Sequence, residues 1–410
     1  MPNEDEIHLW EFPPETTYLL LEREFQKVKV DEAVSKQGSM KALSTYLNQT
    51  AEGYGIFSRY GAGNICDWKK GRMIHGQRRH IWIPLWVVME IEKLTNENED
   101  ERLKNLEEIE SRTTSYKGLE TGTPITNPKL PIKVTPEFDS IVFHLMGDGC
   151  WGGKGKLSSY RQKNKQGRDQ FVQKLHNVFG CFEINQYESE CEWKVCIPSH
   201  LVRIIEKYYG LETPESRRRV PAQIMEKHWH HKIAGLAAFL VDEGNVGDSI
   251  DIYASNKPLL EDLQKICEER DYSSKVVLKA SAGYRSHTID HYRLRIGLES
   301  VEKLHKDLQD IAQIYPACTL AQKQKRFEMI VARRSLHRKK GENGAVKKQI
   351  LMLLATGPKN VNEMKEELLI GGQTIREHLH QLKKGNKIER VGRIGNGEIW
   401  NLTQKSDSLF

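Results

Sequence analysis

Two acidic residues end two apolar stretches of this sequence in the same way. Asp148 lies between two glycines at the end of "HLMGDG", and Glu243 precedes Gly244 in "LAAFLVDEG", about 95 residues later. The apolar residues before each acid predict a helix, and the glycine after it predicts that helix's end. An acid at a helix C-terminus opposes the helix dipole. If both acids were incidental, the protein would have this unfavourable interaction with a helix dipole at two places. The repetition therefore favours a chemical role for the acids.

Small residues beside these acids allow two helices to pack closely. The second stretch contains Ala234, Gly235, Ala237 and Ala238, and Gly147 precedes the first acid. Side-by-side packing would bring Asp148 and Glu243 together, where two carboxylates repel unless cations join them. Oxygen ligands suit Mg²⁺ or Mn²⁺, and paired acids holding metal suit in-line displacement at a phosphodiester. We predict that both acids are metal ligands and catalytic residues.

The segments that follow the two acids repeat one order of elements. The order is helix, two strands, helix, two strands, helix, and it occurs in residues 130–220 and again in residues 221–315. The first strand pair of each half has the weakest pattern. An internal duplication determines the architecture, so we predict an α+β fold with a duplicated αββαββα unit. Two halves in one chain also predict a monomer with internal pseudo-symmetry.

The N-terminal third of the chain predicts a small domain and a linker. Three short helical patterns in residues 1–94, with Lys69 and Lys70 exposed on the middle one, resemble a helix-turn-helix module. An ordinary helical domain is the alternative. Residues 95–129 are charged and turn-rich, which predicts a linker with at most one exposed helix.

The C-terminal part predicts a basic connector and a second small domain. Residues 316–342 form the connector, and the interval from Ala321 to Lys348 holds ten Lys or Arg against two Glu, a polyanion-binding signal. Residues 343–410 show three amphipathic helices and a strand hairpin, which resembles a winged-helix domain. Its candidate DNA-binding residues are Arg376, Lys383, Lys384 and Arg393. Such domains also serve as protein-protein modules.

The two acidic motifs also carry a family resemblance. "IVFHLMGDG" and "LAAFLVDEG", with the duplicated elements behind them, resemble the LAGLIDADG (dodecapeptide, DOD-type) homing endonucleases over about Leu130 to Gln313, and their lead-in sequences resemble archaeal members. In that family the acid before the final glycine binds divalent metal, which maps to Asp148 and Glu243. The two twisted sheets form a pseudo-twofold saddle over the DNA major groove. The resemblance implies a free-standing, sequence-specific, double-strand DNA endonuclease.

Some positions depart from the family pattern. The family's helix-contact glycine is replaced by Phe143 and Ala238, and its upstream aspartate by Met146 and Val241. The bulky Phe143 either faces a small residue or loosens the helix seam.

The resemblance also suggests residues of the predicted strands that face the substrate. Family members often place a basic residue near the cleft, and the candidates for this catalytic role are Lys194 and Lys279. Further DNA-binding candidates on the strands are Tyr160, Arg161, Tyr253, Arg293 and Arg295. The two tyrosines either touch DNA or fill the sheet.

The overall composition narrows the class of protein to which this chain can belong. The net charge is +6, 38% of residues are hydrophobic, and the longest apolar run is near "LAAFLV", far short of a membrane span. Seven scattered cysteines without a CxxC pair predict reduced thiols in the cytoplasm. The main alternative function is a DNA-binding transcriptional regulator that keeps this fold and does not cut. RNA maturase activity, known among relatives, also stays open.

Overall fold

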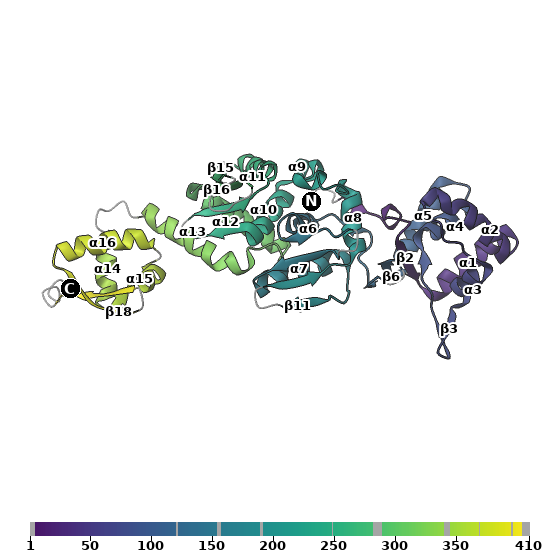
Figure 1. Ribbon diagram of the computed structural model, residues 1–410, viewed down its shortest axis with the longest axis horizontal. Coiled ribbons are helices and arrows are strands. Elements are labelled where there is room, and N and C mark those ends of the chain that lie inside the picture. Colours follow the sequence, from purple (N-terminus) through teal and green to yellow (C-terminus); the bar gives the residue numbers. More distant parts are fainter. Residues whose placement is uncertain are drawn as a thin grey trace.

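The computed structural model describes residues 5–119, 122–153, 157–188, 192–247, 249–281, 289–339, 345–368, 370–394 and 397–403. The chain is elongated, with an N-terminal part at one end, a central part that contains two sheets, and a C-terminal part at the other end (Figure 1). Helices and strands are mixed throughout, which confirms the α+β class. In the described residues no helix is both long and apolar enough to cross a bilayer.

The N-terminal part combines helices with a sheet. Its helices are α1 (Arg23–Gln37), α2 (Met40–Thr50), α3 (Ala62–Lys70), α4 (Leu85–Thr95) and α5 (Glu99–Ser111). The three predicted helices are α2, α3 and α4. The Ser39 hydroxyl begins α2 by accepting a hydrogen bond from the backbone N–H of Ala42 at 3.1 Å. Between α3 and α4 lie the short strands β3 (Arg72–Ile74), β4 (Gln77–Arg79) and β5 (Ile83–Pro84).

The predicted linker is wrong. Residues 95–129 instead hold α5 and two strands, β6 (Thr113–Gly118) and β7 (Ile125–Thr126). They join β2 (Thr17–Leu21) in a sheet of order β5-β2-β6-β7. The sequence does not predict β6, because the strand is polar and its partner β2 lies about a hundred residues earlier in the chain. Thr17 of β2 pairs with Gly118 of β6. A pairing at that separation leaves no local pattern.

The central part contains two series of elements in the same order. The first is α6 (Pro136–Met146), β9 (Gly149–Cys150), β10 (Ser159–Gln162), α7 (Lys165–Phe179), β11 (Gln186–Glu188), β12 (Trp193–Cys196) and α8 (Ser199–Tyr209). The second is α10 (Trp229–Glu243), β13 (Gly244–Val246), β14 (Ile250–Ala254), α11 (Lys257–Glu269), β15 (Ser274–Ala280), β16 (His291–Ile296) and α12 (Val301–Ile314). Each series forms one antiparallel sheet, of order β9-β10-β12-β11 and β13-β14-β16-β15 respectively.

The helices α6 and α10 pack against each other in parallel. A Cβ added to Gly235 would lie 2.2 Å from the Phe143 ring, so the bulky residue of α6 occupies the space that a glycine of α10 leaves free. Two acid–histidine contacts cross the seam in opposite senses. Asp139 of α6 meets Nδ1 of His231 at 2.7 Å, and Asp242 of α10 meets Nδ1 of His144 at 2.9 Å. These contacts set the register of the two helices.

The N-terminal and central parts share one hydrophobic core. The short strand β1 (Glu6–Ile7) pairs with β8 (Ile132–Lys133), and Thr126 bridges to Cys181. On the central side of the junction, His200 of α8 stands edge-on to Tyr116 of β6, with ring centroids 5.5 Å apart. The N-terminal part is therefore anchored to the central part by several buried contacts.

The C-terminal part has a core of its own. It follows α13 (Gln324–Lys339), a helix within the predicted basic connector, whose residues 340–342 lie outside the described residues. Its elements are α14 (Ala345–Leu354), β17 (Lys359–Asn360), α15 (Val361–Leu368), α16 (Gly372–Lys384), β18 (Ile388–Ile394) and β19 (Gly397–Leu402). Its core includes Ile350, Met364, Ile375, Leu379 and Trp400. The three predicted helices and the hairpin are all present.

Candidate metal centre

The acids at the ends of α6 and α10 are followed by glycines for a steric reason. A Cβ on Gly149 would lie 2.4 Å from Cα of Leu145, and a Cβ on Gly244 would lie 2.4 Å from the carbonyl oxygen of Leu240. Real Cβ atoms do not approach other atoms so closely. After each acid the chain therefore folds back over its own helix into β9 or β13, and only glycine permits that return.

The two helix ends meet at a cluster of three carboxyl groups. A Cβ on Gly147 at the end of α6 would lie 3.0 Å from Oδ2 of Asp242 on α10. Burial raises the pKa of Asp148 to about 7, with a further contribution from Asp242. Burial also raises the pKa of Glu243 to about 7, and repulsion from Asp148 adds to it. Asp148 and Glu243 thus lie close enough for their charges to interact.

Asp242 anchors a buried polar network beneath these two acids. Its side chain is fully buried. Its carboxylate accepts from the Tyr160 hydroxyl at 2.5 Å and from Gln162 Nε2 at 3.4 Å, and the backbone N–H of Asp148 also donates to it. Burial raises the Asp242 pKa to about 8 despite these donors. The network joins β10 of the first series to α10 of the second.

A histidine and a lysine extend this network away from the acids. Nζ of Lys174 on α7 lies 2.9 Å from Nε2 of His144, whose Nδ1 faces Asp242. Burial, reinforced by the nearby Lys174, holds the pKa of His144 well below its usual range. A neutral imidazole that accepts from Lys174 at Nε2 must donate from Nδ1 to Asp242. The chain of contacts therefore orients the Asp242 carboxylate.

One cation, Lys323, completes the cluster. Its Nζ donates to the carbonyl oxygens of Leu240, Val241 and Gly244 at 2.7, 2.7 and 2.5 Å. These are the last carbonyls of α10 and the first of β13. The ammonium also interacts favourably with all three carboxyl groups. Lys323 therefore offsets both the negative helix end and the acids, which lets them lie together.

One sequence expectation changes at this site, and one residue of the site was not predicted. Tyr160 is fully buried against Asp242, so it is a core residue and not a DNA contact. Lys323, which the sequence analysis did not assign to this site, is a cation that lowers the pKa of all three carboxyl groups. The catalytic roles predicted for Lys194 and Lys279 stay predictions. Lys323 belongs to the basic run from Ala321 to Lys348, but the sequence pattern does not show that this side chain points inward.

The donor set suits a hard divalent cation with incomplete protein ligation. Among the residues that the structure describes, no three His, Cys, Asp or Glu side chains are placed to hold a metal by themselves. Asp148 and Glu243 supply carboxylate oxygens from two sides of the seam. Mg²⁺ keeps several waters and is commonly held by one or two carboxylates together with substrate phosphate oxygens. The two acids fit such a site.

The sheet surfaces next to the acids carry cations. In the second sheet, Ile252 and Leu294 are buried, and the alternate residues Tyr253, Arg293 and Arg295 share the opposite face. Arg293 and Arg295 both pair with Asp251, at 3.7 and 2.8 Å.

Lys194 and Lys279 lie on these same surfaces. The ammonium of Lys279 lies 5.5 Å from the ring centroid of Tyr253. In the first sheet, Arg161 lies directly opposite Lys194 and pairs with Glu192 at 3.1 Å. The two lysines therefore share these faces with the candidate DNA-binding residues.

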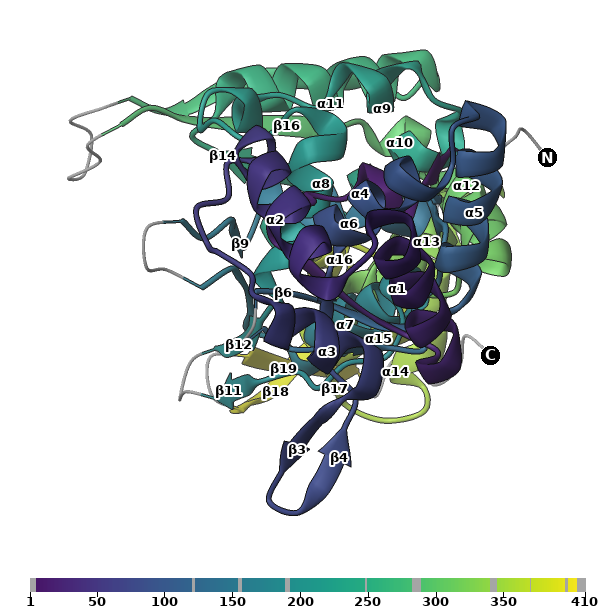
Figure 2. The ribbon, with the colours of Figure 1, turned by 90° about the vertical axis from the view of Figure 1, so that its right-hand side faces the viewer.

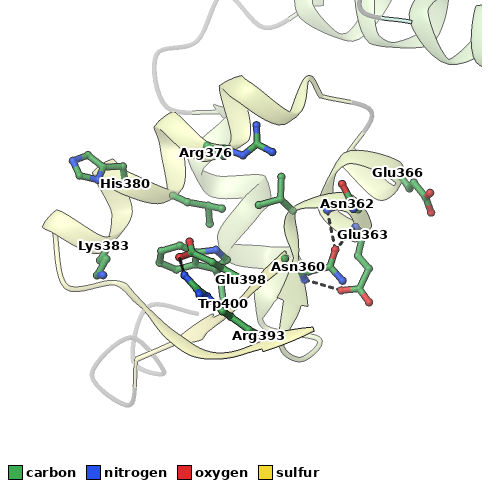
Figure 3. A pocket seen from close by; sticks show the side chains of 13 residues that line it. Asn360, Asn362, Glu363, Glu366, Arg376, His380, Lys383, Arg393, Glu398 and Trp400 are labelled. Carbon is green, nitrogen blue, oxygen red and sulfur yellow. Dashed lines mark hydrogen bonds and ion pairs between the residues drawn. The ribbon is translucent and has the colours of Figure 1, made fainter. Parts of the chain in front are cut away.

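The C-terminal part carries a groove between α16 and the β18–β19 hairpin. The groove encloses about 880 Å³, and Arg376, Lys383 and Arg393 all line it. Figure 3 shows Lys383 beside Trp400, whose ring centroid lies 5.7 Å from its ammonium. Lys384 is exposed outside this groove. In the N-terminal part, Lys69 pairs with Asp31, and Lys70 is exposed.

Comparisons with known proteins give only distant likenesses. No family profile and no curated protein matches the chain. Among solved structures, mesophilic variants of the homing endonuclease I-DmoI are 20% identical, with a TM-score of 0.31, over 43% of this chain and 96% of that chain. I-DmoI in complex with DNA and Mn gives the same values. I-DmoI in complex with DNA and Ca is 19% identical, with a TM-score of 0.31, over 42% and 89% of the two chains.

Proposed function

We propose that this protein is a metal-dependent, sequence-specific double-strand DNA endonuclease of the LAGLIDADG type. The observation that carries the proposal is the meeting of Asp148 and Glu243 at the ends of two parallel helices, with pKa values raised by burial and by charge repulsion. Perturbed carboxyl groups clustered at one place are typical of functional sites. The motif resemblance supports the same assignment.

The residues of the cluster would divide the work. Asp148 and Glu243 would hold Mg²⁺ or Mn²⁺, which when bound supplies an activated water and stabilises the leaving oxygen. Asp242 fixes the end of α6 through the N–H of Asp148, and Tyr160 and His144 hold Asp242 in place. Lys323 stabilises the α10 end before any cation arrives. The cationic sheet faces would bind the phosphates of the duplex.

The domain assignment follows from the same proposal. Residues 130–220 and 221–315 would be two pseudo-twofold halves that form a saddle over an asymmetric site, so that one chain suffices. The parts on either side would act as helix-turn-helix-like and winged-helix modules that lengthen the DNA footprint. Arg376, Lys383 and Arg393 in the C-terminal groove support this role.

The proposal is tested by cleavage of a randomised-site duplex library with Mg²⁺ or Mn²⁺. We expect specific double-strand products from the wild type. Asp148→Asn and Glu243→Gln should each lower the rate by more than about 100-fold, since even groups that only orient metal ligands contribute about 10–100-fold. DNA binding should survive both changes. Asp271→Asn, on an exposed turn, is the matched control and should cut normally. A library left intact by the wild type would refute nuclease activity.

A non-cutting DNA-binding regulator is the second candidate. It is favoured by the separate core of the C-terminal part and by the cations in its groove, because such a module can bind DNA without the central site. Sequence-specific binding by the wild type, without cleavage and unchanged in Asp148→Asn, would select this candidate.

A further inference from the structure

A basic hairpin projects from the N-terminal part and has no packing role in the described structure. Strands β3 and β4 form a two-stranded sheet and pair only with each other. Every residue of β4 is exposed, as are Arg72 and Met73 of β3. Figure 2 shows the hairpin extending from the body beyond α3. An isolated two-stranded hairpin adds little stability in water, so its presence needs another explanation.

The hairpin nevertheless has a defined shape. His75 and Gly76 form its two-residue turn with φ values of 50° and 76°. Positive φ at both central residues is the type I′ geometry, which matches the twist of the flanking strands. At its base, Gly71 has φ of 77°, and a Cβ there would lie 2.6 Å from the carbonyl oxygen of Arg79. The hairpin is therefore closed directly against the end of α3.

The charge of this segment has one sign. Residues 69–79 contain five cations and no acid: Lys69, Lys70, Arg72, Arg78 and Arg79. Lys69 pairs with Asp31, and Arg72 pairs with Asp67 at 2.5 Å. Among the described residues, Arg78 and Arg79 have no ion-pair partner. The strand β4 thus presents uncompensated positive charge.

The cross-strand register adds a second observation. Arg72 lies directly opposite Arg79, and Met73 lies opposite Arg78. Directly opposed like charges destabilise a strand pair. Residues that face each other share one side of the ribbon, so Arg79 points from one side and Arg78 from the other. An anionic partner would reduce the repulsion between Arg72 and Arg79. If it reached both sides of the ribbon, it would contact Arg78 as well as Arg79.

We propose that the β3–β4 hairpin is a DNA-binding wing that lies in a groove of the duplex. The major groove admits a two-stranded ribbon. The groove has a wall of phosphates on each side, and the β3–β4 hairpin has a cation on each side. Arg78 and Arg79, on opposite sides of the ribbon, each contact the phosphates of one wall. This inference rests on the proposed DNA-binding function and adds a contact surface far from the acidic cluster.

The test compares salt dependence of binding. Fluorescence anisotropy of a labelled random-sequence duplex of about 30 base pairs, roughly three helical turns, gives Kd at several salt concentrations. The double variant Arg78→Gln/Arg79→Gln should lower the magnitude of the slope of log K against log salt by about 1.8, since each phosphate contact contributes about 0.9. The control Lys27→Gln/Lys36→Gln removes two cations of α1 that already pair with glutamates. It should keep the wild-type slope.

The outcomes separate this inference from the proposed function. An unchanged slope in the hairpin variant, with tight binding by the wild type, would overturn the wing and leave the nuclease proposal intact. An equal loss in the control would also overturn it, because the effect would then be general electrostatics. Failure of the wild type to bind the duplex at low salt would overturn both. Stronger hairpin-dependent binding to a double-stranded RNA of the same sequence would overturn the choice of DNA.

Discussion

The acids of the cluster lie in different surroundings although they are neighbours. Asp242 is fully enclosed by Tyr160, Gln162 and His144, whereas Asp148 and Glu243 are only partly exposed at the helix ends. The enclosed carboxylate has its hydrogen bonds satisfied by protein. The two outer acids have fewer protein donors and are available for a cation. Their environment, and not their residue type, assigns these roles.

Metal binding at the outer acids should depend on pH. Burial raises the pKa of Asp148 and Glu243 to about 7, so both hold protons more tightly in the folded protein than in the unfolded chain. A divalent cation binds the deprotonated forms. We expect the affinity for Mn²⁺, measured by calorimetry, to rise between about pH 6 and about pH 8 and then to level off.

The same shifts predict the stability of the metal-free protein. A raised carboxyl pKa stabilises the fold at low pH, and that contribution is lost as pH rises from the unfolded value near 4 through about 7. The double variant Asp148→Asn/Glu243→Gln should lack this loss. A wild-type Mn²⁺ affinity that does not vary with pH would contradict both expectations.

Lys323 should matter most when metal is absent. Replacement by Met removes three hydrogen bonds to helix-end carbonyls and the charge that faces the acids. We expect Lys323→Met to lose about 1.5–3 kcal/mol in EDTA, the range for charged hydrogen bonds, and to regain more stability from Mn²⁺ than the wild type does. Thermal unfolding with and without Mn²⁺ measures both effects. Lys325→Met, exposed two residues later, should change neither.

At the scale of elements, the α6–α10 pair depends on steric fit and on polar register. Phe143 fills the space beside Gly235, and the two acid–histidine contacts face opposite ways across the seam. A slip of one helix along the other would break both contacts and bring Phe143 against a side chain. The seam therefore determines how the two carboxyl-bearing ends align.

The fit at Gly235 can be tested by overpacking. Gly235→Ala should lower the free energy of unfolding by about 1–3 kcal/mol, because the new methyl group overlaps the Phe143 ring. Chemical denaturation measures the loss, and Phe143→Leu in the same chain should restore part of it. Gly63→Ala in α3, where a Cβ meets nothing within 4 Å, should instead stabilise by up to about 1 kcal/mol. Equal effects of both alanines would disprove the close contact.

At the scale of the whole molecule, the N-terminal part is joined to the centre through His200. A Cβ on Gly118 would lie 2.4 Å from Cβ of His200, and Tyr116 stands edge-on to its ring. Burial lowers the pKa of His200 to about 3. The junction therefore requires a neutral imidazole, while the unfolded chain takes up a proton near pH 6.5.

The junction should weaken in acid. A lowered histidine pKa contributes stability above about pH 6.5 and loses it as pH falls toward about 3, at roughly 1.4 kcal/mol per pH unit. His200→Gln should be less stable than the wild type at neutral pH, and this difference should shrink at pH near 5 because glutamine does not titrate. Thermal unfolding at both pH values tests this. A constant difference would indicate that His200 contributes only packing.

The sequence predicts those elements whose pattern lies within a short segment of the chain. Apolar periodicity located α6, α10 and the C-terminal helices, because each pattern repeats within one or two turns. The glycines after Asp148 and Glu243 marked the helix ends for the same reason. The repeated order of elements in the central part followed from comparing two such local series.

Tertiary structure alone decided which side chains complete the site. Tyr160 and Asp242 are 82 residues apart in sequence and share a hydrogen bond, and Lys323 reaches Leu240 across 83 residues. The pairing of β6 with β2 spans a similar distance. None of these contacts leaves a periodic trace, because each depends on how separately formed elements pack. The sequence by itself determined the two acids and the helices that end in them, and packing determined what surrounds them.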